Sequence, residues 1–318
     1  MDTSLSVVIP AYKARFLEHA LDSLAVQTDG EFDVHVGDDA SPDDLSSIVS
    51  RYDGRLRIHF HRFPGNLGGT SLAGHWNRCV LNSVARWVLL LGDDDMLDPG
   101  AVAAFRVTCE ETRGAFDLYR FNTRRIDAEG HVIRINAEHP RVETSLEFLR
   151  DRFLVKRSSF TCEYVFSRAA FSRDGGFPDF PVGWCSDIAA WIRFAANTGI
   201  RTIPGPLASW RESSVNLSAD TLSLRRAKVV AMSLYLEWLA DQLGHGLTEE
   251  EEPPDLRALG VAWFFDRFWQ WPSPLSLRDC VSIAGRLSKF ERGARVRSLL
   301  RLLKHSVVPA SSRDTARG

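Results

Sequence analysis

The sequence predicts an α/β protein organised around a largely parallel sheet. Strand and helix patterns alternate three times before residue 92, which is typical of parallel strands connected by helices. Residues 87–91 are all apolar and lead into a glycine and three aspartates, which indicates a strand buried on both faces. From residue 221 onward strand patterns disappear, so we expect a helical C-terminal region.

Each early element follows from its local pattern. β-branched and aromatic runs predict strands, and apolar residues three or four positions apart predict helices. The expected strands are 5–9, 32–36, 56–60 and 87–91, and the expected helices are 16–24, a short one reaching Val49, and 71–85. Ser41 or Asp43 is a suitable cap for the short helix.

The same patterns continue with less regular alternation. The expected helices are 101–109, 146–154 and 188–196, and the expected strands are 116–121, 131–135 and 160–166. Pro204-Gly205-Pro206 interrupts the chain. Residues 249–254, four glutamates and two prolines, form a solvated linker between helices. We therefore expect a catalytic domain over 1–215, a helical region over 216–309 and a disordered tail over 310–318.

Composition excludes several classes of protein. A net charge of −2 gives no reason to expect nucleic-acid binding. The five cysteines are scattered and never form a CxxC pair, which favours reduced thiols in the cytoplasm over disulfides or zinc. The N-terminus lacks a secretion signal and no apolar run approaches a membrane span. The expected location is cytoplasmic.

Three polar segments directly follow predicted strands: Pro10-Ala11-Tyr12, Asp38-Asp39 and Asp93-Asp94-Asp95. Ligands of open α/β sheets bind beyond the carboxyl ends of the strands, so these segments should meet at one edge. The glycine fingerprint of a coenzyme dehydrogenase is absent after the first strand, as are a P-loop and a GxSxG elbow.

The acidic cluster suggests a metal site. Three like charges at the end of a buried strand are unfavourable unless they share a cation. Carboxylate ligands suit Mg²⁺ or Mn²⁺ better than zinc. The alternative is a solvated acidic turn, because aspartate is common after strands.

These segments together resemble family 2 glycosyltransferases of the GT-A fold. The resemblance rests on Leu5-Ser-Val-Val-Ile-Pro-Ala-Tyr12, Val36-Gly-Asp-Asp-Ala-Ser41, and Leu91-Gly-Asp-Asp-Asp95 with Pro99. It covers residues 4–215 and implies an α/β GT-A domain with a mostly parallel sheet, followed here by an α-helical extension.

The resemblance implies roles for individual residues. Nucleotide binding falls to Pro10, Ala11, Tyr12, Asp39, Asp93 and Arg211. Asp38 would orient its turn. Counting back from Pro99 makes Asp94 the metal ligand and Asp93 the ribose partner, and it stays open whether Asp93 or Asp95 shares the ion. Gly92 stands where the family often has its first aspartate.

The implied catalytic base is Asp187, since Ser186-Asp187 resembles the family's acidic pair at the start of a helix. An aspartate there can take the proton of an attacking hydroxyl. The competing interpretation is that Ser186 or Asp187 caps the helix. Arg211 would neutralise the diphosphate. Ser213 stands where relatives carry a histidine, which leaves the third metal ligand open.

The resemblance implies an inverting glycosyltransferase that needs Mn²⁺ or Mg²⁺. It would move a sugar from a UDP- or dTDP-type nucleotide sugar to the hydroxyl of a glycan or lipid-linked acceptor, in bacterial polysaccharide or glycoconjugate synthesis. The alternatives are a nucleotidyltransferase and a nucleotide-sugar-binding protein without turnover. The substitutions at Gly92, Ser186 and Ser213 keep the last alternative open.

The C-terminal segment 275–305 is strongly basic. It carries eight Lys or Arg residues against two acids, Asp279 and Glu291. An apolar side is supplied by Leu287, Phe290, Leu299, Leu300, Leu302 and Leu303. This pattern predicts an amphipathic helix. Either its leucines pack on the rest of the protein, or the helix makes a peripheral contact with an anionic membrane.

Overall fold

The structure, a computed structural model, describes residues 2–213, 222–270 and 275–306. Its contacts divide the chain into two compact units. Unit 1 comprises residues 1–179 and 186–216, and unit 2 comprises residues 180–185 and 217–318. The expected boundary at 215/216 and the expected tail at 310–318 both lie outside the described residues. Segment 180–185, expected in the first domain, groups with the C-terminal helices.

Unit 1 is organised around one mixed sheet. Within the described residues its strand order is β3-β2-β1-β4-β9-β6-β10-β5, and β7 and β8 pair with β6 and β10. The strands are β1 Leu5–Ala11, β2 Phe32–Asp38, β3 Arg57–Arg62, β4 Trp87–Leu90, β5 Met96–Leu97, β6 Leu118–Ile126, β7 Val132–Ile135, β8 Val142–Glu143, β9 Tyr164–Ser167 and β10 Ile200–Arg211. The first four are mutually parallel, as expected. Their carboxyl ends therefore meet at one edge.

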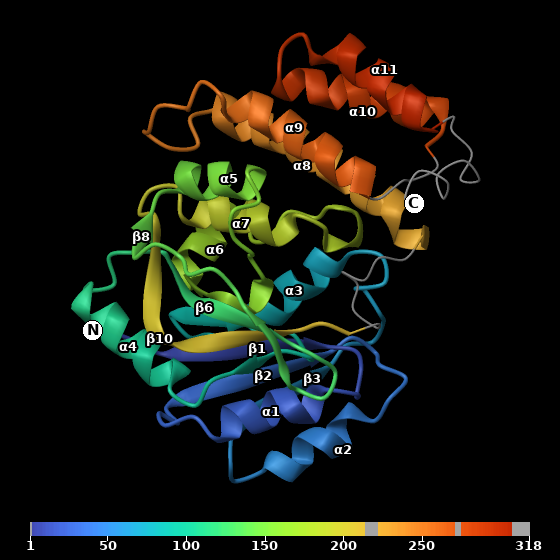
Figure 1. The fold of residues 1–318 in the computed structure, drawn as a ribbon. Helices are drawn as coiled ribbons and strands as arrows, with labels where there is room; N and C mark the ends of the chain where they lie inside the picture. The colour runs from blue at the N-terminus through green and yellow to red at the C-terminus, as the bar shows by residue number, and fades with distance from the viewer. Residues whose placement is uncertain (1, 214–221, 271–274, 307–318) are drawn as a thin grey trace. The chain divides into compact units, whose positions relative to one another are not determined.

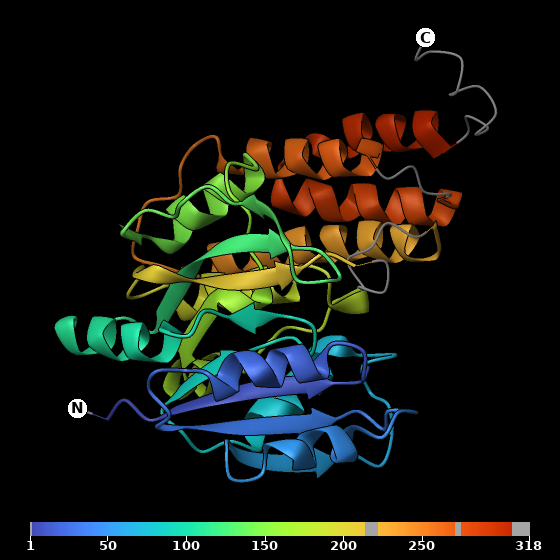
Figure 2. The same ribbon diagram turned by 60° about the horizontal axis from the view of Figure 1, so that its bottom comes forward.

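Helices cover both faces of this parallel part (Figure 1). Helices α1 (Leu17–Ala25) and α2 (Leu45–Val49) lie on one face, and α3 (Leu72–Leu81) lies on the other. Strands β1 and β4 are buried between them, apart from the half-buried Pro10. The second view shows α1 and α2 along the same side of the sheet (Figure 2). Burial on both faces explains the unbroken apolar runs.

Two local predictions need correction. Asp44 caps α2 by accepting the N–H of Ser47, instead of Ser41 or Asp43. Residues 161–163, expected as strand, form the short 3₁₀ helix η2 (Thr161–Glu163) before β9.

In β10 the pairing register shifts between Ile203 and Leu207, at the Pro-Gly-Pro segment, because proline cannot donate to the sheet ladder.

The remaining described helices of unit 1 are α4 Ala101–Glu111, α5 Ser145–Phe153, α6 Arg168–Asp174 and α7 Ser186–Phe194. Of these, α4, α5 and α7 were expected from the sequence, and α6 was not. Helix α7 begins at Ser186, so Ser186 and Asp187 occupy its first turn and neither residue precedes the helix as a cap.

Unit 2 is helical throughout its described residues, as expected. It contains η3 Pro181–Gly183, α8 Leu222–Gly244, α9 Leu256–Gln270, α10 Leu277–Phe290 and α11 Ala294–Ser306. The acidic segment 249–254 connects α8 to α9, as predicted. Among the described helices, none combines the length and apolar character needed to cross a bilayer.

Candidate active site

Asp93 joins the ends of two central strands. Its Oδ2 accepts the backbone N–H groups of Tyr12 at 2.9 Å and Lys13 at 3.0 Å. The carboxylate follows β4, and the two amides follow β1, which pairs with it in parallel. The structure thus brings the first and third predicted segments together at the carboxyl edge of the sheet.

The second segment, Asp38-Asp39, contacts the segment after β1 through the turn that follows β2. Asp38 is fully buried; its Oδ1 accepts the N–H of Ser41 at 2.8 Å and its Oδ2 pairs with Arg62. Ser41 in turn donates its hydroxyl to the carbonyl of Tyr12 at 2.6 Å. Asp38 therefore orients the turn, as the resemblance implies, and Ser41 holds the turn against the segment after β1.

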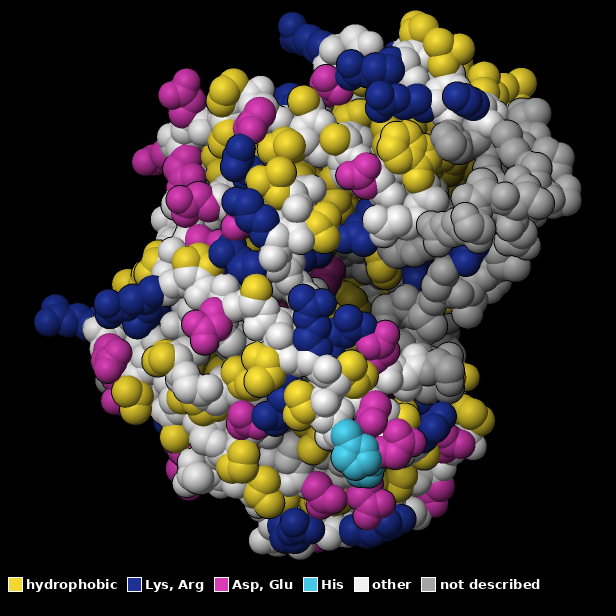
Figure 3. Space-filling view, viewed as in Figure 1, with side chains coloured by type: hydrophobic (Ala, Val, Ile, Leu, Met, Phe, Trp, Pro, Cys, Tyr) yellow, Lys and Arg dark blue, Asp and Glu magenta, His cyan; other side chains and the backbone are white. Residues whose placement is uncertain are grey.

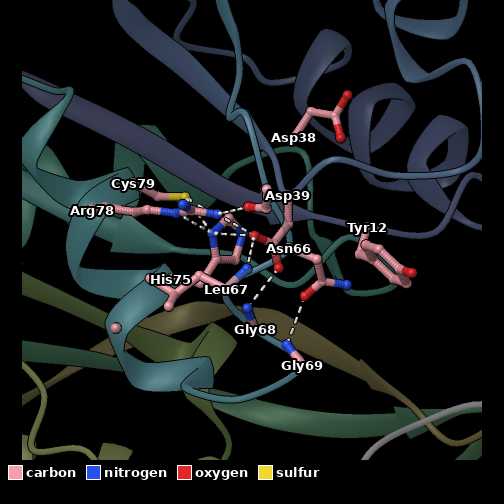
Figure 4. Close-up of polar contacts among 12 residues, drawn as sticks. Tyr12, Asp38, Asp39, Asn66, Leu67, Gly68, Gly69, His75, Arg78 and Cys79 are labelled. Carbon is pink, nitrogen blue, oxygen red and sulfur yellow. Dashed lines mark hydrogen bonds and ion pairs between the residues drawn. The ribbon is translucent and has the colours of Figure 1, made fainter.

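Asp39 is buried beneath the glycine-rich loop (Figure 4). Its Oδ1 accepts the N–H of Leu67 at 2.9 Å and its Oδ2 accepts the N–H of Gly68 at 2.8 Å. A Cβ on Gly68 would lie 2.7 Å from that Oδ2, so glycine is needed for the loop to approach this closely. Tyr12, 38% exposed, lies at the same edge with an open ring.

Two residues of α3 complete the surroundings of Asp39 and were missed from the sequence. The Arg78 guanidinium pairs with Asp39, donates to the carbonyl of Gly65 at 3.0 Å, and lies 3.8 Å from the centre of the Phe63 ring. The His75 ring accepts the Nε–H of Arg78 at its Nδ1, 3.1 Å away. Burial lowers the pKa of His75 to about 4. The three-residue spacing of His75 and Arg78 on a helix was the available signal.

Asp94 and Asp95 crowd around Gly92. A Cβ on Gly92 would lie 2.8 Å from Oδ2 of Asp95 and 2.9 Å from Oδ1 of Asp94. The two carboxylate oxygens therefore converge on the space that a side chain at position 92 would occupy. This explains why glycine stands where the family often has an aspartate.

The surroundings of the three carboxylates raise the pKa of each of them. Burial raises the pKa of Asp93. Burial and the neighbouring charges of Asp95 and Asp93 hold the pKa of Asp94 well above its usual value. Burial likewise raises the pKa of Asp95 to about 6. Of the three, Asp95 is buried and Asp93 and Asp94 are half-buried. A group of carboxylates with raised pKa values is typical of a functional site.

Arg211 lies beneath this cluster and is fully buried. Its Nε donates to the Asp94 carbonyl at 2.8 Å, and its Nη1 donates to the carbonyls of Asp127 and Ala128 at 2.8 and 3.0 Å. The guanidinium also lies 4.7 Å from the centre of the Phe16 ring. With its donors directed at protein acceptors and no exposed surface, Arg211 cannot reach a diphosphate in this arrangement. We replace the predicted diphosphate contact with a structural role.

Asp187 is connected to the acidic cluster by two consecutive residues of the short helix η2. Thr161 Oγ1 donates to Asp187 Oδ2 at 3.3 Å, and the thiol of the next residue, Cys162, lies near Asp95; burial raises the pKa of that thiol, and the charge of Asp95 raises it further. Asp187 Oδ1 also accepts the N–H of Ile188 at 2.8 Å. Burial raises the pKa of Asp187. Consecutive residues of η2 thus bring the predicted base beside the predicted metal ligands.

The metal centre itself has few protein ligands. Among the described residues, no three His, Cys, Asp or Glu side chains are grouped so that they could hold a metal ion. Ser213, in the position of the family's histidine, adds no such ligand. Two aspartates whose oxygens converge beside Gly92 are the remaining candidates, and a divalent ion held by them would need further oxygen ligands from outside the chain.

Comparison with known proteins finds one family similar to the N-terminal half of the chain. Residues 6–157 match the model described as "Glycosyl transferase family 2". This segment, slightly less than half of the chain, is similar to glycosyl transferase family 2. The matched range includes β1, β4 and the acidic cluster, and so confirms the resemblance seen in the sequence.

The sequence relatives of this chain are distant. It is 29% identical over 98 residues to an uncharacterized glycosyltransferase of Rickettsia felis, covering 30% of this chain and 15% of the relative. The chain thus matches only a small part of that relative's length. It is also 24% identical over 274 residues to an uncharacterized protein of Mycobacterium tuberculosis, covering 82% of this chain and 81% of the relative.

Solved structures agree on the fold. Residues 1–349 of S. aureus TarS, in complex with UDP-GlcNAc, superpose with a TM-score of 0.68 at 16% identity, covering 96% of this chain and 90% of that one. The mannosyltransferase PcManGT from Pyrobaculum calidifontis, in complex with GDP-Man and Mn²⁺, gives a TM-score of 0.51 at 17% identity, covering 95% and 86%. The GT-A fold predicted from the sequence is confirmed.

Proposed function

We propose that this chain is a metal-dependent, inverting glycosyltransferase that takes a sugar from a UDP- or dTDP-type donor. The observation that carries the proposal is the link between Asp187 and Asp95 through Thr161 and Cys162. It brings a half-buried carboxylate, suited to take a proton, near carboxylates suited to a divalent ion. Sugar transfer from a nucleoside diphosphate needs both groups near one reacting bond.

The residues fit a divalent ion. Asp94 and Asp95 offer two oxygens that converge beside Gly92, and oxygen ligands suit Mn²⁺ or Mg²⁺. When bound, the ion would offset the negative charge that builds on the departing diphosphate. Donor oxygens and water would complete its ligands, which is consistent with the absence of a third grouped protein ligand among the described residues.

Asp187 would act as the base. As the acceptor hydroxyl oxygen bonds to the anomeric carbon, the bond from that carbon to the diphosphate oxygen breaks, and the hydroxyl proton passes to Asp187. Thr161 and the N–H of Ile188 fix the carboxylate by hydrogen bonds. Its raised pKa makes the carboxylate a stronger proton acceptor than an exposed aspartate.

The nucleotide would bind where the three segments meet. Pro10 and Ala11 lead to the open ring of Tyr12, which is suited to contact a base. Oδ1 of Asp39 accepts the N–H of Leu67 and pairs with Arg78, whereas Oδ2 accepts the N–H of Gly68. Oδ2 therefore keeps a lone pair that can accept the N3–H of a uracil or thymine. Asp93 accepts the N–H groups of Tyr12 and Lys13 and directly precedes Asp94. It remains the proposed ribose partner.

The acceptor and the biosynthetic pathway are proposed from the resemblance to family 2 glycosyltransferases. We propose a glycan or lipid-linked acceptor hydroxyl in bacterial polysaccharide or glycoconjugate synthesis. The five buried cysteine thiols are consistent with a reducing, cytoplasmic location. TarS in complex with UDP-GlcNAc and PcManGT in complex with GDP-Man and Mn²⁺ support a nucleotide-sugar donor and a divalent ion.

Two measurements test the proposal. Isothermal titration with UDP, dTDP and GDP, each with and without Mn²⁺, should show metal-dependent binding of a pyrimidine nucleotide. A screen of nucleotide sugars by thermal shift, followed by assay of donor hydrolysis, should then find one sugar that is released slowly. Binding without any turnover would favour the nucleotide-sugar-binding alternative, and release of pyrophosphate from a triphosphate would favour a nucleotidyltransferase.

A further inference from the structure

Helix α11 presents an apolar ridge on the side opposite its packing face. Its buried residues Ala294, Ser298 and Leu302 recur every four positions. Val296 and Leu300, also four positions apart, are 69% and 64% exposed. Because residues separated by four positions share one face of a helix, α11 has one face turned into unit 2 and an apolar face turned to solvent.

Basic side chains flank this ridge. Arg292, Arg295, Arg297, Arg301 and Lys304 are all exposed, and Figure 3 shows Lys and Arg side chains beside hydrophobic ones over α11 at the top of the view. The acidic residue in this stretch, Glu291, pairs with Arg297 at 2.9 Å. The ion pairs of the described residues leave Arg292, Arg295 and Lys304 without an acidic partner.

The basic residues of α10 differ from those of α11. Arg286 and Lys289 both pair with Glu237 of α8, which offsets their charge within unit 2. The predicted apolar side of 275–305 is also divided, since Leu287, Phe290 and Leu302 are buried and serve packing. Helix α10 also exposes Leu277 and Val281 beside Arg278, but the basic residues without an acidic partner are more numerous on and beside α11.

We infer that α11 docks on an anionic lipid bilayer, with Val296 and Leu300 entering the headgroup region and the basic residues contacting lipid phosphates. An interfacial helix combines an apolar face with flanking Lys and Arg in this way. A nucleic-acid backbone would match the charges but would leave the apolar ridge without a partner. A second copy of α11 would match the ridge but would oppose basic residues to basic residues. A bilayer accommodates both features.

The charges set the expected salt dependence. Each basic residue apposed to an anionic leaflet contributes about fivefold to the partition coefficient, and salt screens the effect. The apolar ridge contributes by burial and is insensitive to salt. The inference does not depend on the proposed catalytic function, because it concerns residues of unit 2 alone.

Flotation of the full chain with lipid vesicles tests the inference. Vesicles of phosphatidylcholine alone are compared with vesicles containing about one third phosphatidylglycerol, at low and high salt. We expect flotation only with the anionic vesicles, and much weaker flotation at high salt. Failure to float with anionic vesicles at low salt, or equal flotation with neutral ones, would overturn the inference.

Paired variants locate the contact. Val296→Ser with Leu300→Ser should lower the bound fraction about tenfold, and Arg295→Gln with Lys304→Gln should lower it and weaken its salt dependence. Val84→Ser and Arg51→Gln, which change exposed residues of unit 1, are the matched controls. Unchanged flotation of both α11 variants would overturn the inference. A dimer that sedimentation detects for the wild-type chain and not for the α11 variants would also overturn the inference, since a second copy of the chain would then cover the ridge.

Discussion

The backbone N–H of Arg211 donates to Oδ1 of Asp95 at 3.0 Å across 116 positions of sequence. This contact joins the end of β10 to the acidic cluster that follows β4. The guanidinium of the same residue holds the carbonyl of Asp94. Arg211 therefore fixes the carboxylate of Asp95 and the backbone of Asp94, the two aspartates most suited to bind a metal ion, and it does so from a buried position.

Arg211→Met should lower the free energy of unfolding by about 3 kcal/mol, because several buried carbonyls lose their donor at once. Arg125→Met is the matched control. Arg125 is part-exposed and pairs with Glu212, so its loss should cost less than about 1 kcal/mol. Urea unfolding at neutral pH measures both. Wild-type stability in Arg211→Met together with much weaker UDP binding would restore the diphosphate role.

His75 should make stability depend on pH. Its pKa is about 4 in the folded chain because of burial and about 6.5 in an unfolded chain. Between these values the unfolded state binds more protons, so stability is complete above about pH 6.5 and falls as the pH is lowered toward 4, by at most about 1.4 kcal/mol per pH unit.

Urea unfolding between about pH 7.5 and 4.5 measures this slope. His75→Gln keeps an acceptor for Arg78 but does not titrate, so the slope should decrease in this variant. His131→Gln, which replaces an exposed histidine, should leave the slope as it is in the wild type. An identical slope in wild type and His75→Gln would mean that His75 is not buried as a neutral ring.

Gly92→Ala tests the convergence of the two carboxylates. The added Cβ would lie under 3 Å from oxygens of both Asp94 and Asp95, so at least one carboxylate must move. We expect unchanged folding and at least tenfold weaker Mn²⁺-dependent UDP binding by titration. Gly65→Ala, where a Cβ meets no atom within 4 Å, is the control for adding a methyl group. Normal binding in Gly92→Ala would show that these two oxygens do not share an ion.

Asp94→Asn should abolish the stabilisation by UDP that requires Mn²⁺. At a ligand concentration of 100 times Kd, binding adds about 2.7 kcal/mol to stability, which thermal shift detects easily. Asp53→Asn, at an exposed turn, should retain the full effect. If Asp94→Asn keeps an unchanged metal-dependent shift, the ion is held elsewhere.

Patterns that depend on neighbouring residues were predictable, and contacts between distant residues were not. The apolar runs of β1 and β4 predict buried parallel strands, and the strand ends predict where the three segments meet. Nothing in the local sequence shows that Arg211 turns inward, because its burial depends on carbonyls at 94, 127 and 128. The position of Cys162 near Asp95 was also not predictable, since it arises only when η2 folds against β4.

Asp187 should affect the rate and hardly affect donor affinity. Its carboxylate is fixed by Thr161 and Ile188, and removal of a general base typically lowers turnover about 10²- to 10⁴-fold. Asp187→Asn keeps the size and the hydrogen-bonding ability of the side chain, so the free energy of unfolding should change by less than about 1 kcal/mol. Titration with UDP and Mn²⁺ should give a wild-type Kd.

Thr161→Val provides a second measurement, since loss of one hydrogen bond should reduce kcat modestly and shift the acidic limb of its pH profile. That limb reports the protonation of Asp187, because the base works only when ionised, and removing a donor that stabilises the carboxylate should move it to higher pH. Asp179→Asn, at an exposed position near α7, is the control and should leave kcat unchanged. Near-normal turnover of Asp187→Asn would return Asp187 to a purely structural role at the start of α7.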